Sequence, residues 1–317
     1  MKHIFIINPT AGKTDRRRSI YQMGEALRSN HGVDVEYILT KSHGHAEQIA
    51  RQIAQKGEPV RFYACGGDGT INEVANGIVG SDNAAMSCIP IGTGNDFLKN
   101  FGMDISRFCD VENLWNGEVQ KLDLIACNDR VCLTIACSGV DARIAESVHH
   151  VGQSPILTGK GSYLASAAYH FLLRGIAQHY TLTLDDETME DDFALVSVCN
   201  GRHYGGSVMP MPYADMKDGI LQTIVAKNVS RAQFAKLFPL YSKGQIEKID
   251  ESLLKVYTPE RVVIQSEEEI TTCLDGECFR SHEVHLSLSP HKLNFFGYAG
   301  CDPNATMRKR EDPVAYF

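Results

Sequence analysis

Three short glycine-bearing loops have the composition of a phosphate-binding site. They are Asn8–Lys13 (NPTAGK), Gly66–Thr70 (GGDGT) and Gly92–Asp96 (GTGND). Glycine allows backbone N–H groups to approach an anion closely and to adopt positive φ angles. A helical stretch follows each loop, and the N-terminus of a helix favours negative charge. The loops together therefore indicate a site for a phosphorylated ligand.

Two carboxylates lie inside these loops and need a counter-charge. Asp68 and Asp96 would repel a phosphate unless a cation lay between them, and Mg²⁺ is a hard ion that carboxylate and phosphate oxygens bind. The chain contains neither the G-x-x-x-x-G-K-[ST] loop nor the dinucleotide fingerprint G-x-G-x-x-G. A lone glycine loop would indicate only a turn. Three such loops, each after a strand, predict a phosphate-binding site, and Mg²⁺ is the natural cation to balance the two carboxylates.

The elements that must position these loops alternate between strands and helices. Short apolar strands separated by helical stretches predict a parallel sheet with helices on both faces, that is, an N-terminal doubly wound α/β domain. Such sheets bind ligands at the carboxyl edge of their strands, and each glycine loop follows a strand. The predicted strands are Lys2–Asn8, Val33–Leu39, Val60–Gly67 and Ala85–Gly92, and the predicted helices are Asp15–Asn30, His45–Gln55 and Asn72–Val79.

From about residue 125 the pattern changes to strands separated by turns. It predicts a C-terminal antiparallel β-sandwich domain over 126–297, after a nucleotide-binding domain over 1–125. Two helices interrupt it, Gly161–Leu173 and Arg231–Tyr241. The first is apolar but too short to span a bilayer, so a core helix is favoured over one wall of a lipid cleft. The predicted strands include a hairpin about Asn128-Asp129, then Tyr180–Leu184, Phe193–Cys199, Ile220–Ala226, Leu253–Tyr257, Arg261–Ser266, Ile270–Leu274, Val284–Leu288 and Leu293–Phe296.

Composition limits the class of protein. Hydrophobic residues make up 43% and charged residues 22% of the 317 residues, as in ordinary globular proteins. The formal net charge of -8 argues against nucleic acid as a partner. None of the 10 cysteines belongs to a C-x-x-C pair, so buried reduced thiols are expected. Neither a secretory signal nor an apolar run of roughly 20 residues is apparent, and we expect a cytoplasmic protein with transient, peripheral membrane contact.

The sequence around the glycine loops resembles the diacylglycerol kinase catalytic domain family. The likeness rests on GGDGTINEVANGI and PIGTGNDFLKNFG, together with NPTAGK, TKSHGHA, KLDLI, CNGRHYGGSVMPMPYADMKDGIL and LDGE. It covers nearly the whole chain and is closest to the bacterial lipid kinases, which also resemble sphingosine and ceramide kinases. GGDGT alone would be less specific, because NAD kinases and phosphofructokinases carry similar loops.

The resemblance implies a lipid kinase that uses ATP and Mg²⁺, with diacylglycerol as the leading substrate at a membrane surface. It implies an active site in the cleft between the two domains, and a tail over 298–317 that packs back on the first domain. Glu277 would be the general base, and Asp68, Asp96 and Asp123 would position Mg²⁺ and its waters. The Asp218 carboxylate and the carbonyls of Asp215 and Ile220 would hold a second, structural metal. The nucleotide contacts would be Asn8, Thr10, Thr40, Gly66, Gly67, Asp68, Gly69, Thr70, Ile71, Asn72 and Thr93.

The chain departs from the family's pattern in its second half. Ser207 stands where the family often has a third glycine after Tyr204, and Ser138 stands where it often has a glycine before Gly139. These departures leave the identity of the lipid open. The oligomeric state, with a homodimer among the alternatives, and the membrane-docking surface are open as well.

Several of these residues also have simpler explanations. Asp275-Gly276 is a type I′ hairpin signature, Asp218-Gly219 is a common turn pair, and Asp123 could be a charge at a strand edge. His43 and His45 are expected at a helix start rather than on a metal, because no third ligand is evident.

Two other functions stay open at this point. GGDGT by itself would also fit an NAD kinase, and a chain that kept its loops could be a non-catalytic module that responds to nucleotide or lipid. Retention of Glu277 argues against the second alternative.

Overall fold

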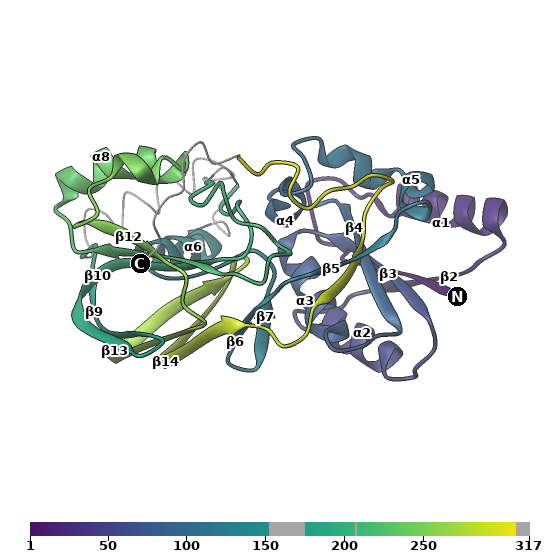
Figure 1. The fold of residues 1–317 in the computed structure, drawn as a ribbon. Coiled ribbons are helices and arrows are strands. Elements are labelled where there is room, and N and C mark those ends of the chain that lie inside the picture. Colours follow the sequence, from purple (N-terminus) through teal and green to yellow (C-terminus); the bar gives the residue numbers. More distant parts are fainter. Residues whose placement is uncertain (152–174, 207, 309–317) are drawn as a thin grey trace. The chain divides into compact units, whose positions relative to one another are not determined.

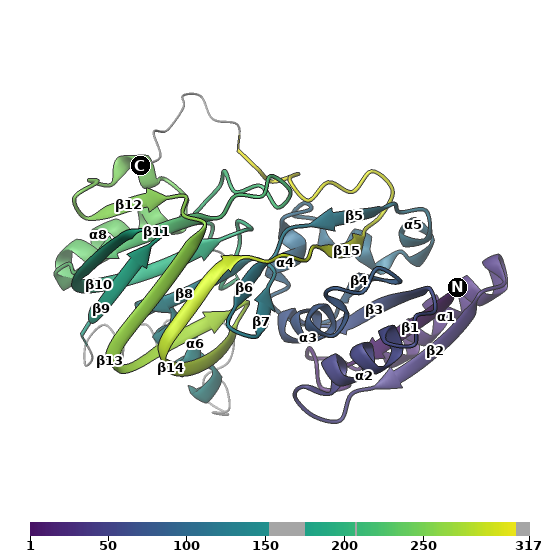
Figure 2. The same ribbon diagram turned by 60° about the horizontal axis from the view of Figure 1, so that its bottom comes forward.

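The chain folds into two compact units (Figures 1 and 2). The computed structural model describes residues 1–151, 175–206 and 208–308. The first unit combines Met1–Leu124, Met216–Asp218 and Ser289–Thr306, and the described remainder forms the second. The helix predicted at Gly161–Leu173 and the residue Ser207 lie outside the described residues. All 10 cysteines lie within them; none forms a disulfide, and most are buried, as predicted.

A six-stranded sheet forms the centre of the first unit (Figure 2). The first four strands along the chain are parallel to one another, β15 is parallel to β4, and β5 is antiparallel to β15. Ile4–Ile7 are fully buried, as continuous apolar strands are when helices cover both faces of a sheet. The strand order is β2 (Asp34–Leu39), β1 (Lys2–Ile7), β3 (Val60–Gly66), β4 (Ala84–Pro90), β15 (Leu293–Phe296) and β5 (Val119–Leu122).

Helices cover both faces of this sheet, which confirms the predicted α/β class. After β1 the chain forms β2 at the edge of the sheet, and it then crosses over β1 to form β3 on the other side. Right-handed crossovers therefore put α1 and α2 on opposite faces, and Figure 1 draws α1 with α5 on one side and α2 with α3 on the other. The direction of winding reverses between β1 and β3, where open α/β sheets bind ligands. The helices are α1 (Arg17–His31), α2 (His45–Ala54), α3 (Asp68–Ile78), α4 (Asp96–Lys99), the 3-10 helix Ile105–Cys109 and α5 (Val111–Trp115).

Strand β15 comes from the far end of the sequence. We predicted Leu293–Phe296 as the last strand of the second domain, whereas it lies between β4 and β5 of the first sheet. Its aromatic side chains explain the difference. Phe295 packs on Phe97 and Phe101, with ring centroids 5.2 and 4.8 Å away. Just beyond it, the hydroxyl of Tyr298 donates to the carbonyl of Phe101 at 2.8 Å.

The second unit is rich in antiparallel strands, as predicted. The long strands β10 and β13 each pair with β8 over one part and with β9 over another, so β8 and β9 both lie between them. Alternate residues face two apolar clusters: Ala136 enters one, and Ile135 and Cys137 enter the other. The elements are β6 (Ile125–Cys127), β7 (Arg130–Cys132), β8 (Ile135–Gly139), α6 (Val140–Val151), β9 (Gln178–Leu184), β10 (Glu187–Cys199), β11 (Gln222–Lys227), α8 (Arg231–Ser242), the 3-10 helix Ile246–Lys248, β12 (Leu254–Tyr257), β13 (Arg261–Leu274) and β14 (Glu277–Leu288).

The hairpin turns predicted from the sequence are present. Asn128 has φ 52° between β6 and β7. Asp275 and Gly276 have φ 50° and 100°, and Leu274 pairs with Glu277 across them. Positive φ at both central residues is the signature of a type I′ turn, whose twist matches that of the flanking strands.

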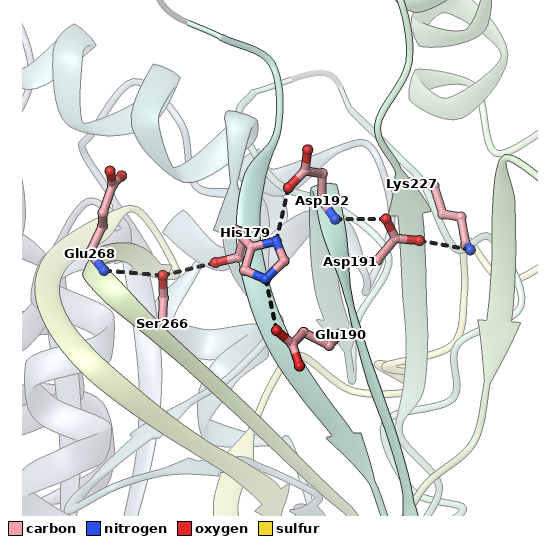
Figure 3. Close-up of polar contacts among 7 residues, drawn as sticks. All are labelled: His179, Glu190, Asp191, Asp192, Lys227, Ser266 and Glu268. Carbon is pink, nitrogen blue, oxygen red and sulfur yellow. Dashed lines mark hydrogen bonds and ion pairs between the residues drawn. The ribbon is translucent and has the colours of Figure 1, made fainter.

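An exposed polar network lies on β9 and β10 (Figure 3). His179 Nδ1 lies 3.0 Å from a carboxylate oxygen of Asp192, and Nε2 lies 3.2 Å from one of Glu190. Next to them, Asp191 forms a 2.9 Å ion pair with Lys227. The hydrogen bonds to Glu190 and Asp192 raise the pKa of His179 above its ordinary value of 6.5.

We expect this network to be sensitive to pH. The pKa of His179 is raised in the folded state, so the protonated imidazole stabilises the fold. This contribution to the free energy of unfolding is fully present below pH 6.5 and is lost as the pH rises through the pKa of the folded state. An NMR titration of the imidazole should give a pKa above 6.5, and the Glu190→Gln/Asp192→Asn variant should bring it back. A wild-type pKa at or below 6.5 would contradict the geometry.

Candidate active site

The side chain of Asn8 joins the loops that follow β1 and β3. Its backbone N–H donates to the carbonyl of Cys65 at 2.9 Å, and its side-chain amide donates to the hydroxyl of Thr70 at 3.3 Å. Its side-chain oxygen accepts from the N–H and the hydroxyl of Thr10, at 3.0 and 2.8 Å. Asn8, Thr10 and Thr70, all predicted to contact the nucleotide, thus meet where the winding of the sheet reverses.

The glycine loops also pack on one another backbone to backbone. The carbonyl of Gly66 accepts from the N–H groups of Ile91 and Gly92, both at 3.1 Å. A Cβ on Gly92 would lie 2.5 Å from the Cα of Gly67, and a Cβ on Gly12 would lie 2.1 Å from the carbonyl oxygen of Ile91. Side chains at these positions would separate the loops, so the glycines are required for the loops to meet.

The carboxylates of Asp68 and Asp96 both lie around Gly94. A Cβ on Gly94 would be 2.6 Å from Oδ2 of Asp68 and 4.0 Å from Oδ2 of Asp96. Asp68 also accepts from the N–H of Phe97 at 3.4 Å, and Asp96 is paired with Lys99. The structure therefore brings together, on two loops, the two carboxylates that were predicted to serve Mg²⁺.

The remaining predicted nucleotide residues differ in exposure. Thr40 follows β2, and its N–H donates to the carbonyl of Ile7 at 2.9 Å. Gly69 lies in the first turn of α3, and Thr93 lies in the loop after β4. Ile71 and Asn72 are both 1% exposed inside α3. The side-chain oxygen of Asn72 accepts from the side-chain amide of Asn76 at 2.9 Å, so the Asn72 side chain bonds within α3.

Glu73 is a contributor to this region that we did not predict. Its buried carboxylate accepts from the N–H groups of Gly44 and Ala46, at 2.8 and 3.0 Å, and thus caps the N-terminus of α2 from α3. His43 lies 3.3 Å from it, and His45 begins α2. The two histidines are therefore at a helix start, as predicted. No group of three His, Cys, Asp or Glu side chains suited to a metal occurs in the part of the chain that the structure describes.

Asp123 lies between β5 and β6 and is 2% exposed. Its carboxylate forms a 2.7 Å ion pair with Lys292, and its N–H donates to the carbonyl of Met216 at 2.8 Å. The predicted metal segment begins beside Met216, and Gly219 turns the chain with φ 75°. The ion pair with Lys292 balances the charge of the buried Asp123 carboxylate. A carboxylate exposed to water at a strand edge would not need such a partner.

Glu277 opens β14 directly after the type I′ turn and is half-buried. Its neighbour Asp275 holds the turn in place: its carboxylate accepts from the N–H groups of Leu133 and Thr134, at 2.6 and 2.9 Å, and from the Thr134 hydroxyl. The carbonyl of Thr134 also accepts from the N–H of Asn200 at 2.8 Å. The LDGE and CNG motifs, far apart in sequence, therefore meet at Leu133 and Thr134.

A buried carboxylate in α6 was also missed by the sequence analysis. Asp141 accepts from the hydroxyls of Tyr204 and Tyr241, the latter at 3.2 Å. Burial raises the pKa of Asp141. The available signal was an acid two residues after the apolar strand β8, which ends at Gly139. Asp141 and Tyr241 lie at the wall of a pocket whose other lining residues are apolar: Val140, Ala194, Leu195, Ala226, Val229, Phe234, Leu237, Phe238, Ile249, Leu253 and Leu254.

Known protein families match both halves of the chain. The diacylglycerol kinase catalytic domain matches residues 2–127, and the YegS C-terminal NAD kinase beta sandwich-like domain matches residues 134–297. A protein of Staphylococcus carnosus (strain TM300) named "Putative lipid kinase" is 24% identical over 92% of this chain and 94% of its own length. "Putative lipid kinase YtlR" of Bacillus subtilis (strain 168) is 26% identical over 92% of this chain and 99% of its own length.

Solved structures share the fold. A crystal structure described as a putative diacylglycerol kinase from Bacillus anthracis str. Sterne covers 95% of this chain and 98% of its own, with a TM-score of 0.74 and 22% sequence identity. A second structure with the same description and source gives a TM-score of 0.73. The matched domains, their order and this fold agree with the motifs around the glycine loops. The chain therefore belongs to the family of proteins that combine a diacylglycerol kinase catalytic domain with a YegS-type C-terminal domain.

Proposed function

We propose that the protein transfers the γ-phosphoryl group of ATP to a lipid hydroxyl, with diacylglycerol to phosphatidic acid as the leading reaction. One observation carries this proposal. Three glycine loops are packed together at the carboxyl ends of β1, β3 and β4, and two of them bring Asp68 and Asp96 to the same glycine. Phosphoryl transfer depends mainly on positioning and charge neutralisation, which such an arrangement can provide.

We assign the nucleotide phosphates to the N–H groups of Gly66–Thr70 and the N-terminus of α3. Asn8, Thr10, Thr40 and Thr93 complete the proposed nucleotide site. The residues present fit Mg²⁺, because the carboxylates of Asp68 and Asp96 carry hard oxygen donors and both lie around Gly94, where no side chain separates them. When bound, the ion would neutralise charge on the phosphates. Asp68 and Asp96 would hold it there.

Two further metal roles stay proposals on the family resemblance. Asp123 would orient waters of the magnesium ion, with its own charge balanced by Lys292. The segment Asp215–Ile220 would hold a structural metal through one carboxylate and two backbone carbonyls, a donor set of oxygens that suits a hard cation.

We assign the lipid to the second unit. Its apolar pocket, lined by Phe234, Leu237 and Phe238 among others, suits an acyl chain. Glu277 would act as the general base, taking the proton of the lipid hydroxyl as the phosphoryl group is transferred.

Purified protein incubated with labelled ATP, Mg²⁺ and a total lipid extract tests this function. We expect one labelled lipid, and its identification names the substrate. The Asp68→Ala variant is the matched blank, because it keeps the lipid-binding unit but lacks the proposed magnesium ligand. Labelling of lipid by the variant at the wild-type rate would contradict the proposed site, and ATP binding without transfer to any lipid would favour a non-catalytic module.

An NAD kinase activity is the second candidate. It is favoured by one finding, the match of residues 134–297 to a domain described as NAD kinase beta sandwich-like. The same preparation incubated with NAD and ATP separates the two reactions, because formation of NADP without a labelled lipid would overturn the lipid kinase proposal.

A further inference from the structure

Helix α8 lies in the second unit (Figure 1). Its side chains divide into an inner face and an outer face that differ in exposure. The inner face presents Phe234, Leu237 and Tyr241 to the apolar clusters beneath it and lines the apolar pocket. The outer face is exposed, and its residues recur at the spacing of one helical stripe. We call this stripe the α8 outer face: Ala232, Lys236, Pro239 and Lys243.

The α8 outer face is basic in an acidic protein. Between Asp218 and Glu247 the chain has no Asp or Glu, although its net charge is -8. Arg308 adds a further cation at the end of the helix, where its guanidinium donates to the carbonyls of Lys243 and Gly244, at 2.9 and 3.3 Å. A helix C-terminus favours such cations. Three carboxylates on β10 form ion pairs with His179 and Lys227 (Figure 3). Acidic residues return directly after the helix, at Glu247, Asp250 and Glu251.

We infer that the α8 outer face docks the protein on a bilayer that contains anionic phospholipids. This inference rests on the proposed lipid kinase function, since a water-insoluble substrate must be reached at a membrane. Each Lys near an anionic surface contributes about 1 kcal/mol to binding, and the small side chains of Ala232 and Pro239 let the lysines approach the headgroups. None of the helices within the described residues is long and apolar enough to cross a membrane.

The two faces of α8 would then serve one purpose. With the outer face on the bilayer, the pocket lies on the other side of the same helix, within a helix diameter of roughly 10–12 Å. The charge of the outer face and the lining of the pocket are two separate observations on the same helix.

The test measures vesicle binding separately from catalysis. The Lys236→Gln/Lys243→Gln variant removes two exposed cations outside the pocket, and the Lys56→Gln/Lys121→Gln variant removes two exposed lysines of the first unit. We expect sedimentation with phosphatidylcholine–phosphatidylglycerol vesicles to fall about 30-fold for the first variant and to stay unchanged for the second. Binding of the wild type should also fall between about 0.1 M and 1 M salt, as the Debye length shortens from about 10 to 3 Å.

The outcomes separate the docking surface from the function. Equal vesicle binding by both variants and the wild type would overturn the docking surface, whatever the enzyme phosphorylates. A change of oligomeric state in the Lys236→Gln/Lys243→Gln variant would overturn it as well, because the face would then be a contact between copies. Loss of vesicle binding with full turnover of a detergent-dispersed lipid is the result expected. Absence of any lipid phosphorylation, with vesicle binding as predicted, would count against the proposed function alone.

Discussion

Replacement of Glu277 by Gln is expected to lower the rate of phosphoryl transfer to lipid by about 10²–10⁴-fold, the usual contribution of a general base. The amide has nearly the shape of the carboxylate but cannot accept the proton of the lipid hydroxyl. Glu277 is half-buried at the start of β14, and its backbone is fixed by the turn before it. ATP affinity and the melting temperature should therefore stay at the wild-type values, which equilibrium binding and a thermal scan can check.

Asp275→Asn is the matched control for this experiment, two residues away in the same turn. Its carboxylate binds the backbone of Leu133 and Thr134, so its loss should destabilise the turn. A hydrogen bond to a charged group contributes about 1.5–3 kcal/mol, which in a unit of this size corresponds to a melting temperature lower by about 3–12 °C. Should Glu277→Gln keep its activity, or lose stability as Asp275→Asn does, Glu277 would be a turn residue and not the base.

The local parts of the fold could be predicted because short sequence signals determine them. Four apolar strands before Asp96 and the Asp275-Gly276 turn each follow from a few neighbouring residues, and all are present. The three glycine loops could be predicted to meet for a related reason: the carboxyl ends of neighbouring parallel strands share one edge of the sheet.

The parts that could not be predicted depend on residues far apart in sequence. β15 joins the first sheet because Phe295 packs on Phe97 and Phe101. The four residues of β15 alone do not indicate which sheet the strand will join. Glu73 was missed for the same reason, since its hydrogen bonds are to α2 and not to its own helix. The ion pair between Asp123 and Lys292 likewise needs the return of the chain to the first unit.

Replacement of Gly92 by Ala is expected to disrupt the nucleotide site and to destabilise the first unit. The new Cβ would lie 2.5 Å from Cα and 3.0 Å from N of Gly67, and backbone atoms cannot move aside as a flexible side chain can. Overpacking of this kind costs about 1–3 kcal/mol. Separation of the loops by even about 1 Å should lower the transfer rate roughly 10²-fold. Thermal scans and steady-state assays of the purified variant measure both effects.

Gly67→Ala makes the same chemical change on the other side of the same contact. There the Cβ would lie 3.4 Å from Cα of Gly92, an ordinary contact, and the extended backbone of Gly67 (φ -102°, ψ -167°) suits alanine. We therefore expect the melting temperature of Gly67→Ala to equal that of the wild type. The asymmetry is the decisive result, because loss of glycine flexibility alone would affect both variants similarly. Equal melting temperatures for Gly92→Ala and Gly67→Ala would mean that the loops do not pack backbone to backbone, and the proposed phosphate site would lose its basis.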